Sequence, residues 1–158
     1  MNKAIFLDRD GVVNKERGEY TWRLSDFEFN LGLFEALKKL DNYLFIVITN
    51  QGGIAKQIYT HSDIEKTNSL MFKTFADNNL KLTDIYYCPH HTNYGNCLCR
   101  KPNSLMLEKA IARYNINIKK SYFIGDTQRD IDAGKKVGLN TIKINPNDNL
   151  LNYINKIK

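Results

Sequence analysis

Two of the three histidines and all three cysteines of the chain lie between residues 88 and 99, in the stretch CPHHTNYGNCLC. Cys88, His90, Cys97 and Cys99 follow the spacing CxHx6CxC. Three thiolates and one imidazole complete a tetrahedral zinc site with no open coordination position. An odd number of cysteines argues against a disulfide framework, which leaves a set of unligated buried thiols as the alternative. We therefore expect structural zinc at these four residues, with His91 outside the ligand set.

Two cations follow this Cys/His loop (residues 88–99) directly, at Arg100 and Lys101. The loop itself contains little apolar material apart from Tyr94, so metal ligation is the means by which it would become ordered. Arginine offers phosphate a planar bidentate fork, whereas lysine offers a point charge. We expect the zinc to fix both cations where they can bind a phosphate.

A pair of carboxylates ends the first apolar run, at Asp8 and Asp10 in FLDRDG. Two neighbouring carboxylates repel each other, so either one is protonated or a cation lies between them. This pairing suits a nucleophile and an acid/base group that share a divalent ion. Gly11 allows the backbone to approach a ligand closely. The alternative is a pair of loop aspartates that cap turns.

Polar residues also follow two later apolar runs. In ITNQGG, the hydroxyl of Thr49 and the backbone amides after it could bind a phosphoryl oxygen, although such a sequence is also common in ordinary loops. In GDTQRD, Asp126 ends an apolar run and is the better candidate for a metal ligand. Asp130 falls in the first turn of the next expected helix, where an acidic residue favours the helix dipole.

The elements that position these residues are short apolar runs alternating with segments of helical period. We expect strands at 4–8, 43–50, 84–88, 121–126 and 141–144, and helices at 33–40, 63–78, 104–114, 129–137 and 148–157. Ser62 is expected to cap the second helix, with Glu65 in the capping box. Alternating strands and helices predict an α/β fold with a parallel sheet covered on both faces. Ligands of such folds bind beyond the carboxyl ends of the strands, which is where the polar residues stand.

The chain of 158 residues, with a net charge of +6, is long enough for one domain spanning 1–158. The initial apolar run AIFL is too short for a signal peptide or a membrane span, and clustered thiols fit a reducing compartment. We expect a cytoplasmic monomer that binds no membrane. The lysines are scattered, so the charge suits a small anionic metabolite and we expect no nucleic-acid partner.

DRDG, ITN, Lys101 and GDTQRD, in this order, resemble the four motifs of the haloacid dehalogenase-like phosphatase superfamily along nearly the whole chain. The resemblance implies a three-layer, Rossmann-like, doubly wound sheet without a large cap domain. It implies that Asp8 attacks phosphorus and that Asp10 is the general acid and base. Thr49 and Lys101 would hold the transferring phosphoryl group. Asp8, the backbone carbonyl of Asp10, and Asp126 would ligate Mg²⁺.

CPHH and CRKP, together with DRDGVVN and TNQGGIAK, resemble the zinc-containing branch with D-glycero-D-manno-heptose 1,7-bisphosphate phosphatases and histidinol-phosphate phosphatases. The resemblance implies a substrate pocket lined by residues 16–20 and by Asn50, Gln51, Gly52 and Arg100. Two departures concern the site for a second phosphate. Gly52 stands where serine is frequent, and Thr127 stands where lysine or arginine is frequent.

Three functions follow from these patterns. The first is a Mg²⁺-dependent phosphatase for a small phosphorylated sugar, with heptose 1,7-bisphosphate cleaved at C7 as the leading substrate. The second is a histidinol-phosphate phosphatase. The third is a non-catalytic zinc-knuckle module that binds nucleic acid, which explains the cysteines but not the carboxylates at the ends of other strands.

Overall fold

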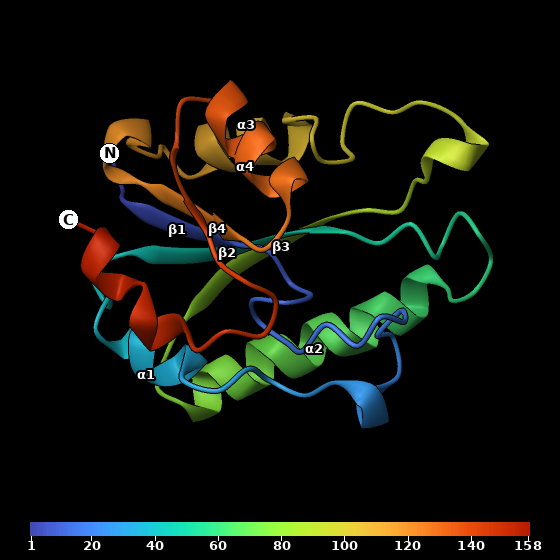
Figure 1. Ribbon diagram of the computed structural model, residues 1–158, viewed down its shortest axis with the longest axis horizontal. Helices are drawn as coiled ribbons and strands as arrows, with labels where there is room; N and C mark the ends of the chain where they lie inside the picture. Colours follow the sequence, from blue (N-terminus) through green and yellow to red (C-terminus); the bar gives the residue numbers. More distant parts are fainter.

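Five strands form one parallel sheet in the computed structural model, which describes residues 1–158, and the strand order is β3-β2-β1-β4-β5 (Figure 1). The strands are β1 (Ala4–Leu7), β2 (Leu44–Asn50), β3 (Leu82–Cys88), β4 (Tyr122–Gly125) and β5 (Asn140–Lys143). The central strand β1 pairs with β2 on one side and with β4 on the other. This confirms the α/β fold with a parallel sheet.

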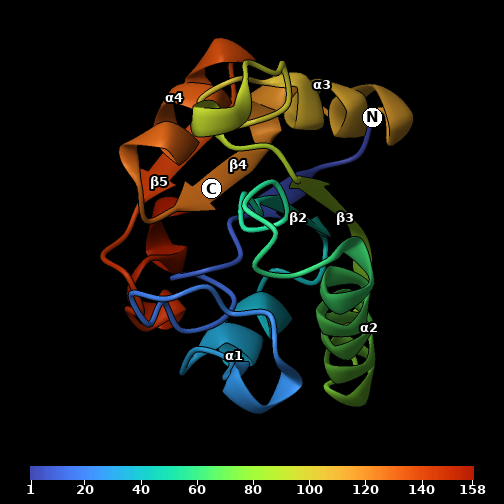
Figure 2. The ribbon, with the colours of Figure 1, turned by 90° about the vertical axis from the view of Figure 1, so that its right-hand side faces the viewer.

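Helices cover both faces of the sheet, so the molecule has three layers (Figures 1 and 2). One face carries α1 (Leu33–Lys38) and α2 (His61–Asp77), and the other carries α3 (Leu105–Arg113) and α4 (Gln128–Lys136). Successive residues of β1 pack into different clusters, Ile5 and Leu7 on the side of α1 and α2, and Ala4 and Phe6 on the side of α3 and α4. A strand buried on both faces explains why β1 is apolar at every position.

The capping box of α2 differs from the expected one. Thr60 is the N-cap, with extended backbone, and its side chain accepts a hydrogen bond from the amide of Asp63. The Asp63 carboxylate accepts in return from the Thr60 amide at 3.0 Å. The predictions of Ser62 as the cap and Glu65 as its partner were therefore wrong by two residues. Thr60 with Asp63 and Ser62 with Glu65 both have the spacing of a capping box, and the helix begins at the earlier of the two.

The expected helix at 148–157 was also wrong. The segment forms two short 3₁₀ turns, Leu150–Asn152 and Ile154–Lys156, that pack against the sheet face of α1 (Figure 1). Asn149 lies before the first turn, and its side chain accepts a hydrogen bond from the Leu151 amide at 3.0 Å. Such side-chain hydrogen bonds compete with helix formation, which explains the broken segment despite its helical period.

The carboxyl ends of β1, β2 and β4 meet at one edge of the sheet because the three strands are parallel neighbours. Asp8 follows β1, Thr49 is the second-last residue of β2, and Asp126 follows β4. The fold therefore brings together residues that are up to 118 positions apart in the sequence. No helix in the structure has the length and apolar character needed to cross a membrane.

Candidate active site

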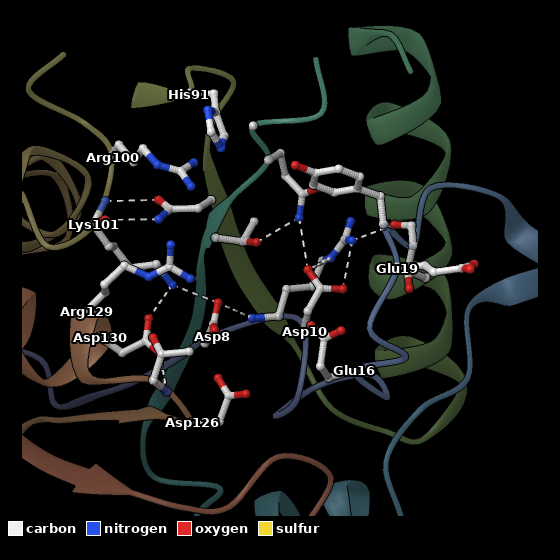
Figure 3. A pocket seen from close by; sticks show the side chains of 18 residues that line it. Asp8, Asp10, Glu16, Glu19, His91, Arg100, Lys101, Asp126, Arg129 and Asp130 are labelled. Carbon is white, nitrogen blue, oxygen red and sulfur yellow. Dashed lines mark hydrogen bonds and ion pairs between the residues drawn. The ribbon is translucent and has the colours of Figure 1, made fainter. Parts of the chain in front are cut away.

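A polar cavity of about 310 Å³ opens at this edge of the sheet, and only one of its 18 lining residues is hydrophobic (Figure 3). Every residue predicted for catalysis, substrate binding or Mg²⁺ lines it: Asp8, Asp10, Thr49, Asn50, Gln51, Gly52, Arg100, Lys101 and Asp126. From the expected pocket segment at 16–20, the structure places Glu16, Glu19 and Tyr20 in the wall. His91 lines the cavity as well.

Lys101 lies at the floor of the cavity with only 3% of its surface exposed. Its ammonium lies 2.7 Å from Oδ1 of Asp8 and 2.6 Å from Oδ1 of Asp130, and it donates to the Ile48 carbonyl at 2.8 Å. Burial acts to lower the pKa of Lys101, but the two carboxylates outweigh it and raise the pKa above its usual value. The lysine is therefore a permanent cation beside Asp8.

Asn50 fixes the backbone at Lys101. Its side-chain carbonyl accepts from the Lys101 amide at 3.0 Å, and its amide donates to the Lys101 carbonyl at 3.1 Å. This two-way pairing joins the end of β2 to the segment that follows the Cys/His loop. Asn50 thus positions the lysine in addition to lining the cavity.

Three carboxylates form an acidic cluster (Asp8, Asp126 and Asp130) whose oxygens lie within 4.8 Å of one another. Burial, followed by the charge of Asp130, raises the pKa of both Asp8 and Asp126. Burial acts in the same direction on Asp130, but the Lys101 ammonium outweighs it and lowers the pKa of Asp130. Lys101 pairs with Asp8 and Asp130, so Asp126 is the carboxylate of the cluster that has no cation beside it.

The acidic cluster fits a divalent cation. Oδ1 of Asp126 is buried and has no hydrogen-bond partner, and the backbone carbonyl of Asp10 accepts no hydrogen bond. Hard oxygen ligands of this kind suit Mg²⁺. Gly11 is required for the geometry, because a Cβ there would lie 2.2 Å from Oδ2 of Asp126, and its φ is +92°.

The Asp10 carboxylate lies outside the acidic cluster and is held by four hydrogen bonds. Nε and Nη2 of Arg9 donate to it at 3.1 and 2.9 Å, Asn14 at 3.0 Å and Gln51 at 3.2 Å. Arg9 is only 1% exposed, and its Nη2 also donates to the carbonyl of Thr21 at 2.5 Å. A buried arginine thus fixes the side chain predicted as the general acid.

Thr49 belongs to the same network through Gln51. The Gln51 amide donates to the Thr49 hydroxyl oxygen at 2.8 Å, and the Tyr59 hydroxyl donates to the Gln51 carbonyl at 2.7 Å. Burial raises the pKa of Tyr59 to about 12, so its hydroxyl keeps the proton that it donates. Because its oxygen accepts from Gln51, the Thr49 hydroxyl keeps its own proton to donate into the cavity.

The four predicted zinc ligands come together beside the cavity, with ligand atoms within 4.8 Å of one another. Sγ of Cys97 lies 3.7 Å from Sγ of both Cys88 and Cys99, and Nδ1 of His90 lies 3.5 Å from Sγ of Cys88. Zn–S bonds of about 2.3 Å at tetrahedral angles place thiolates about 3.8 Å apart, close to the two separations from Cys97, whereas Sγ of Cys88 and Sγ of Cys99 lie 2.8 Å apart and would have to separate around the metal. The Arg100 amide donates to Sγ of Cys97 at 3.4 Å, so the cluster contacts the first of the two cations.

Three residues of the cavity were missed from the sequence as functional residues. Asp130 was assigned to a helix terminus, and it does close a capping box with Thr127, yet it also pairs with Lys101. Arg9 stands between two aspartates, and no periodicity indicates that its side chain turns inward. Arg129 lies in the first turn of α4, where a cation is unfavourable. This unfavourable position was the feature of the sequence that could have indicated a functional role for Arg129.

The comparisons with known proteins agree with this geometry. Residues 98–146 match the family described as HAD-hydrolase-like. The chain is 42% identical over 142 residues to a D-glycero-alpha-D-manno-heptose-1,7-bisphosphate 7-phosphatase of Campylobacter jejuni, covering 89% of this chain and 80% of that protein. It is 41% identical over 142 residues to a D-glycero-beta-D-manno-heptose-1,7-bisphosphate 7-phosphatase of Pasteurella multocida, covering 85% and 77%.

A solved structure gives the same result for the fold. The crystal structure of D,D-heptose 1,7-bisphosphate phosphatase from B. bronchiseptica, complexed with magnesium and phosphate, superposes with a TM-score of 0.84 at 27% identity, covering 93% of this chain and 83% of that one. The non-catalytic zinc-knuckle alternative is set aside, because the relatives are enzymes of one chemistry along most of the chain. The chain belongs to the haloacid dehalogenase-like phosphatases, in the family of the D-glycero-D-manno-heptose-1,7-bisphosphate 7-phosphatases.

Proposed function

We propose that residues 1–158 form one Mg²⁺-dependent phosphatase domain that removes the C7 phosphate of D-glycero-D-manno-heptose 1,7-bisphosphate through an aspartyl-phosphate at Asp8. The observation that carries this proposal is the contact of Asp8 with the buried Lys101 ammonium, at 2.7 Å, on the floor of a polar cavity. The names of the relatives support the choice of substrate.

In the first step, a carboxylate oxygen of Asp8 attacks phosphorus and the bond from phosphorus to the C7 oxygen breaks. The Lys101 ammonium and the Thr49 hydroxyl bind the oxygens of the transferring group. The C7 oxygen leaves as a primary alcohol, which is a poor leaving group, so Asp10 in its protonated form donates a proton to it.

In the second step, Asp10 accepts a proton from a water molecule, whose oxygen attacks phosphorus. The bond between phosphorus and Asp8 breaks, inorganic phosphate leaves, and Asp10 is again protonated for the next cycle. Asp8, the Asp10 carbonyl and Asp126 would hold Mg²⁺, which would supply positive charge to the phosphoryl oxygens. The unpartnered oxygen of Asp126 supports this assignment.

We propose structural zinc at Cys88, His90, Cys97 and Cys99. The convergence of the four ligand atoms supports it, and thiolate ligation fits a reducing, cytoplasmic setting. We propose that the protein works as a monomer on a small phosphorylated metabolite, without nucleic-acid or membrane partners. Histidinol phosphate, the other substrate inferred from the sequence, has one phosphate, and neither the curated relatives nor the solved structure described above is named for it.

The test is phosphate release from heptose 1,7-bisphosphate and from histidinol phosphate, in Mg²⁺, with the wild type and Asp8→Asn. We expect efficient release from the bisphosphate, with heptose 1-phosphate as product, and no turnover by Asp8→Asn, because an amide is a poor nucleophile. Activity of Asp8→Asn above trace levels would refute the covalent mechanism. A clear preference for histidinol phosphate would refute the proposed substrate and leave the phosphatase chemistry intact.

A further inference from the structure

A second charged surface lies in the cavity, apart from the cation at its floor. His91, Arg100 and Arg129 all line the cavity, and the same three residues line the adjoining hollow next to the Cys/His loop. Figure 3 shows them on one side, whereas Glu16 and Glu19 lie on the other. The substrate pocket thus has a basic wall and an acidic wall.

Arg129 has no partner within the protein. It is the second residue of α4, its side chain is exposed, and it makes no hydrogen bond and no ion pair. A cation in the first turn of a helix faces the positive end of the helix dipole, which is unfavourable. Stability of α4 therefore does not explain an arginine here, whereas an anion in the cavity would.

Arg100 and His91 converge above Gly52. A Cβ at Gly52 would lie 2.9 Å from Nη1 of Arg100 and 3.0 Å from the ring of His91, so a side chain at 52 would displace both. Arg100 uses Nη1 to donate to the His90 carbonyl at 3.0 Å, and the rest of its guanidinium makes no hydrogen bond. The absence of a side chain at Gly52 therefore leaves room for two basic side chains.

The charge of this wall is not compensated. Asp8 and Asp130 pair with Lys101, and Glu19 lies 3.9 Å from the guanidinium of Arg17. An added anion would therefore be the first negative group to contact the basic wall.

We propose that Arg129 is a specificity-determining residue that binds the second, uncleaved phosphate of the substrate, together with Arg100 and His91. This inference rests on the proposed function, since the reacting phosphate must occupy the floor between Asp8 and Lys101. The bidentate guanidinium of Arg129 then suits a phosphate monoester dianion at the wall.

Thr127 is consistent with this assignment. Its hydroxyl donates to Oδ2 of Asp130 at 2.8 Å, and its amide donates to the same oxygen at 3.0 Å. The residue therefore serves the capping box that holds Asp130 beside Lys101. Thr127 and Arg129 both line the cavity, and Arg129 is the one that brings a positive charge to it.

The test compares ligand binding in the inactive Asp8→Asn protein, by calorimetry in Mg²⁺ at constant ionic strength. The ligands are heptose 1,7-bisphosphate and heptose 7-phosphate, which share the group bound at the floor. Arg129→Gln is combined with Asp8→Asn, and Lys135→Gln is the control, since Lys135 is an exposed residue of the same helix and loses the same charge.

We expect Arg129→Gln to weaken bisphosphate binding by about ten-fold or more, and to change 7-phosphate binding by less than about two-fold. Lys135→Gln should change neither. Equal weakening for both ligands, no weakening for the bisphosphate, or equal affinity of the parent protein for the two ligands would each overturn the inference. The proposed function fails separately, if the protein with Asp8 intact does not hydrolyse the bisphosphate.

Discussion

Four hydrogen bonds fix the carboxylate of Asp10 at a position next to the acidic cluster. The proposed role of Asp10 as general acid therefore depends on these neighbours. We predict that Asp10→Asn slows hydrolysis of the C7 phosphate by roughly 10²–10⁴-fold, since an amide cannot donate the required proton. The loss should be smaller for an aryl phosphate, whose leaving group needs no proton. Steady-state kinetics on both substrates give the comparison, and equal losses would contradict the role of general acid.

Arg9 is a positioning residue for Asp10. We predict that Arg9→Lys, which keeps the charge but loses the two-pronged contact, lowers kcat on the sugar phosphate by about ten-fold and lowers it less on the aryl phosphate. The measurement is a double-mutant cycle with Asp10→Asn. If Arg9 acts through Asp10, the lysine adds little to the loss already caused by Asp10→Asn.

A full additional loss in the double variant would show that Arg9 acts on the fold and not through Asp10. Circular dichroism and the midpoint of thermal unfolding provide the control, because Arg9 is buried and also bonds the Thr21 carbonyl. A normal midpoint with slower turnover separates positioning from stability.

The residues at strand ends were predictable from the sequence, whereas those that support them were not. Asp8, Thr49 and Asp126 follow apolar runs, and the parallel-sheet rule gathers such residues at one edge. Arg9 and Arg129 line the cavity because their long side chains point towards it. That direction depends on packing across the cavity, which no local pattern records.

The Cys/His loop is the element whose contribution can be tested most directly. We predict that Cys97→Ser loses one zinc ion per chain, because a hydroxyl is a poor replacement for thiolate. The domain should stay folded by circular dichroism, since the two core clusters are built on the sheet. Activity should fall by up to about 10²-fold, because Arg100 and Lys101 lose their fixed backbone.

Metal analysis and phosphate release check this prediction. Leu98→Ala is the matched control, because Leu98 lies in the same loop, is 75% exposed and is not a ligand. A zinc-free Cys97→Ser protein with full activity would refute the link between the loop and the two cations. Native protein without zinc would refute the metal site itself.

At the level of elements, hydrophobic runs predicted all five strands and four helices, because burial on both sides of a sheet leaves a strong pattern. The helix ends were less predictable. Thr60 and Ser62 are both residue types that cap helices well. Which of them becomes the N-cap depends on where the preceding loop ends, and the helix begins after Thr60. The segment 148–157 had helical period but became two 3₁₀ turns, since Asn149 bonds the backbone locally.

For the whole molecule, the acidic cluster couples stability to metal binding. Burial, followed by the charge of Asp130, raises the pKa of Asp8 and Asp126, which means that their charged forms destabilise the metal-free fold. We predict that Asp126→Asn raises the unfolding midpoint in EDTA by about 2–4 °C. Mg²⁺ should raise the midpoint of the wild type but not of Asp126→Asn, which should be inactive.

Differential scanning calorimetry with and without Mg²⁺ makes this measurement. Asp41→Asn is the control for the change in net charge, since Asp41 is exposed and makes no ion pair. If the wild type melts at the same temperature in EDTA and in Mg²⁺, the cluster is not the metal site. If Asp126→Asn is less stable than the wild type in EDTA, its carboxylate stabilises the metal-free fold and the predicted repulsion is wrong.

The strand order has a consequence for how activity arises. The first three strands of the chain are contiguous in the sheet, as are the last two, and the two halves join where β1 pairs with β4. Asp8, Asp10 and Thr49 come from the first half, whereas Lys101, Asp126 and Asp130 come after residue 100. Neither half alone contains all the groups that we propose to bind and cleave a phosphate ester. We therefore expect a nascent or partly unfolded chain to leave the phosphorylated metabolites around it intact. Hydrolysis would begin only after β4 has paired with β1.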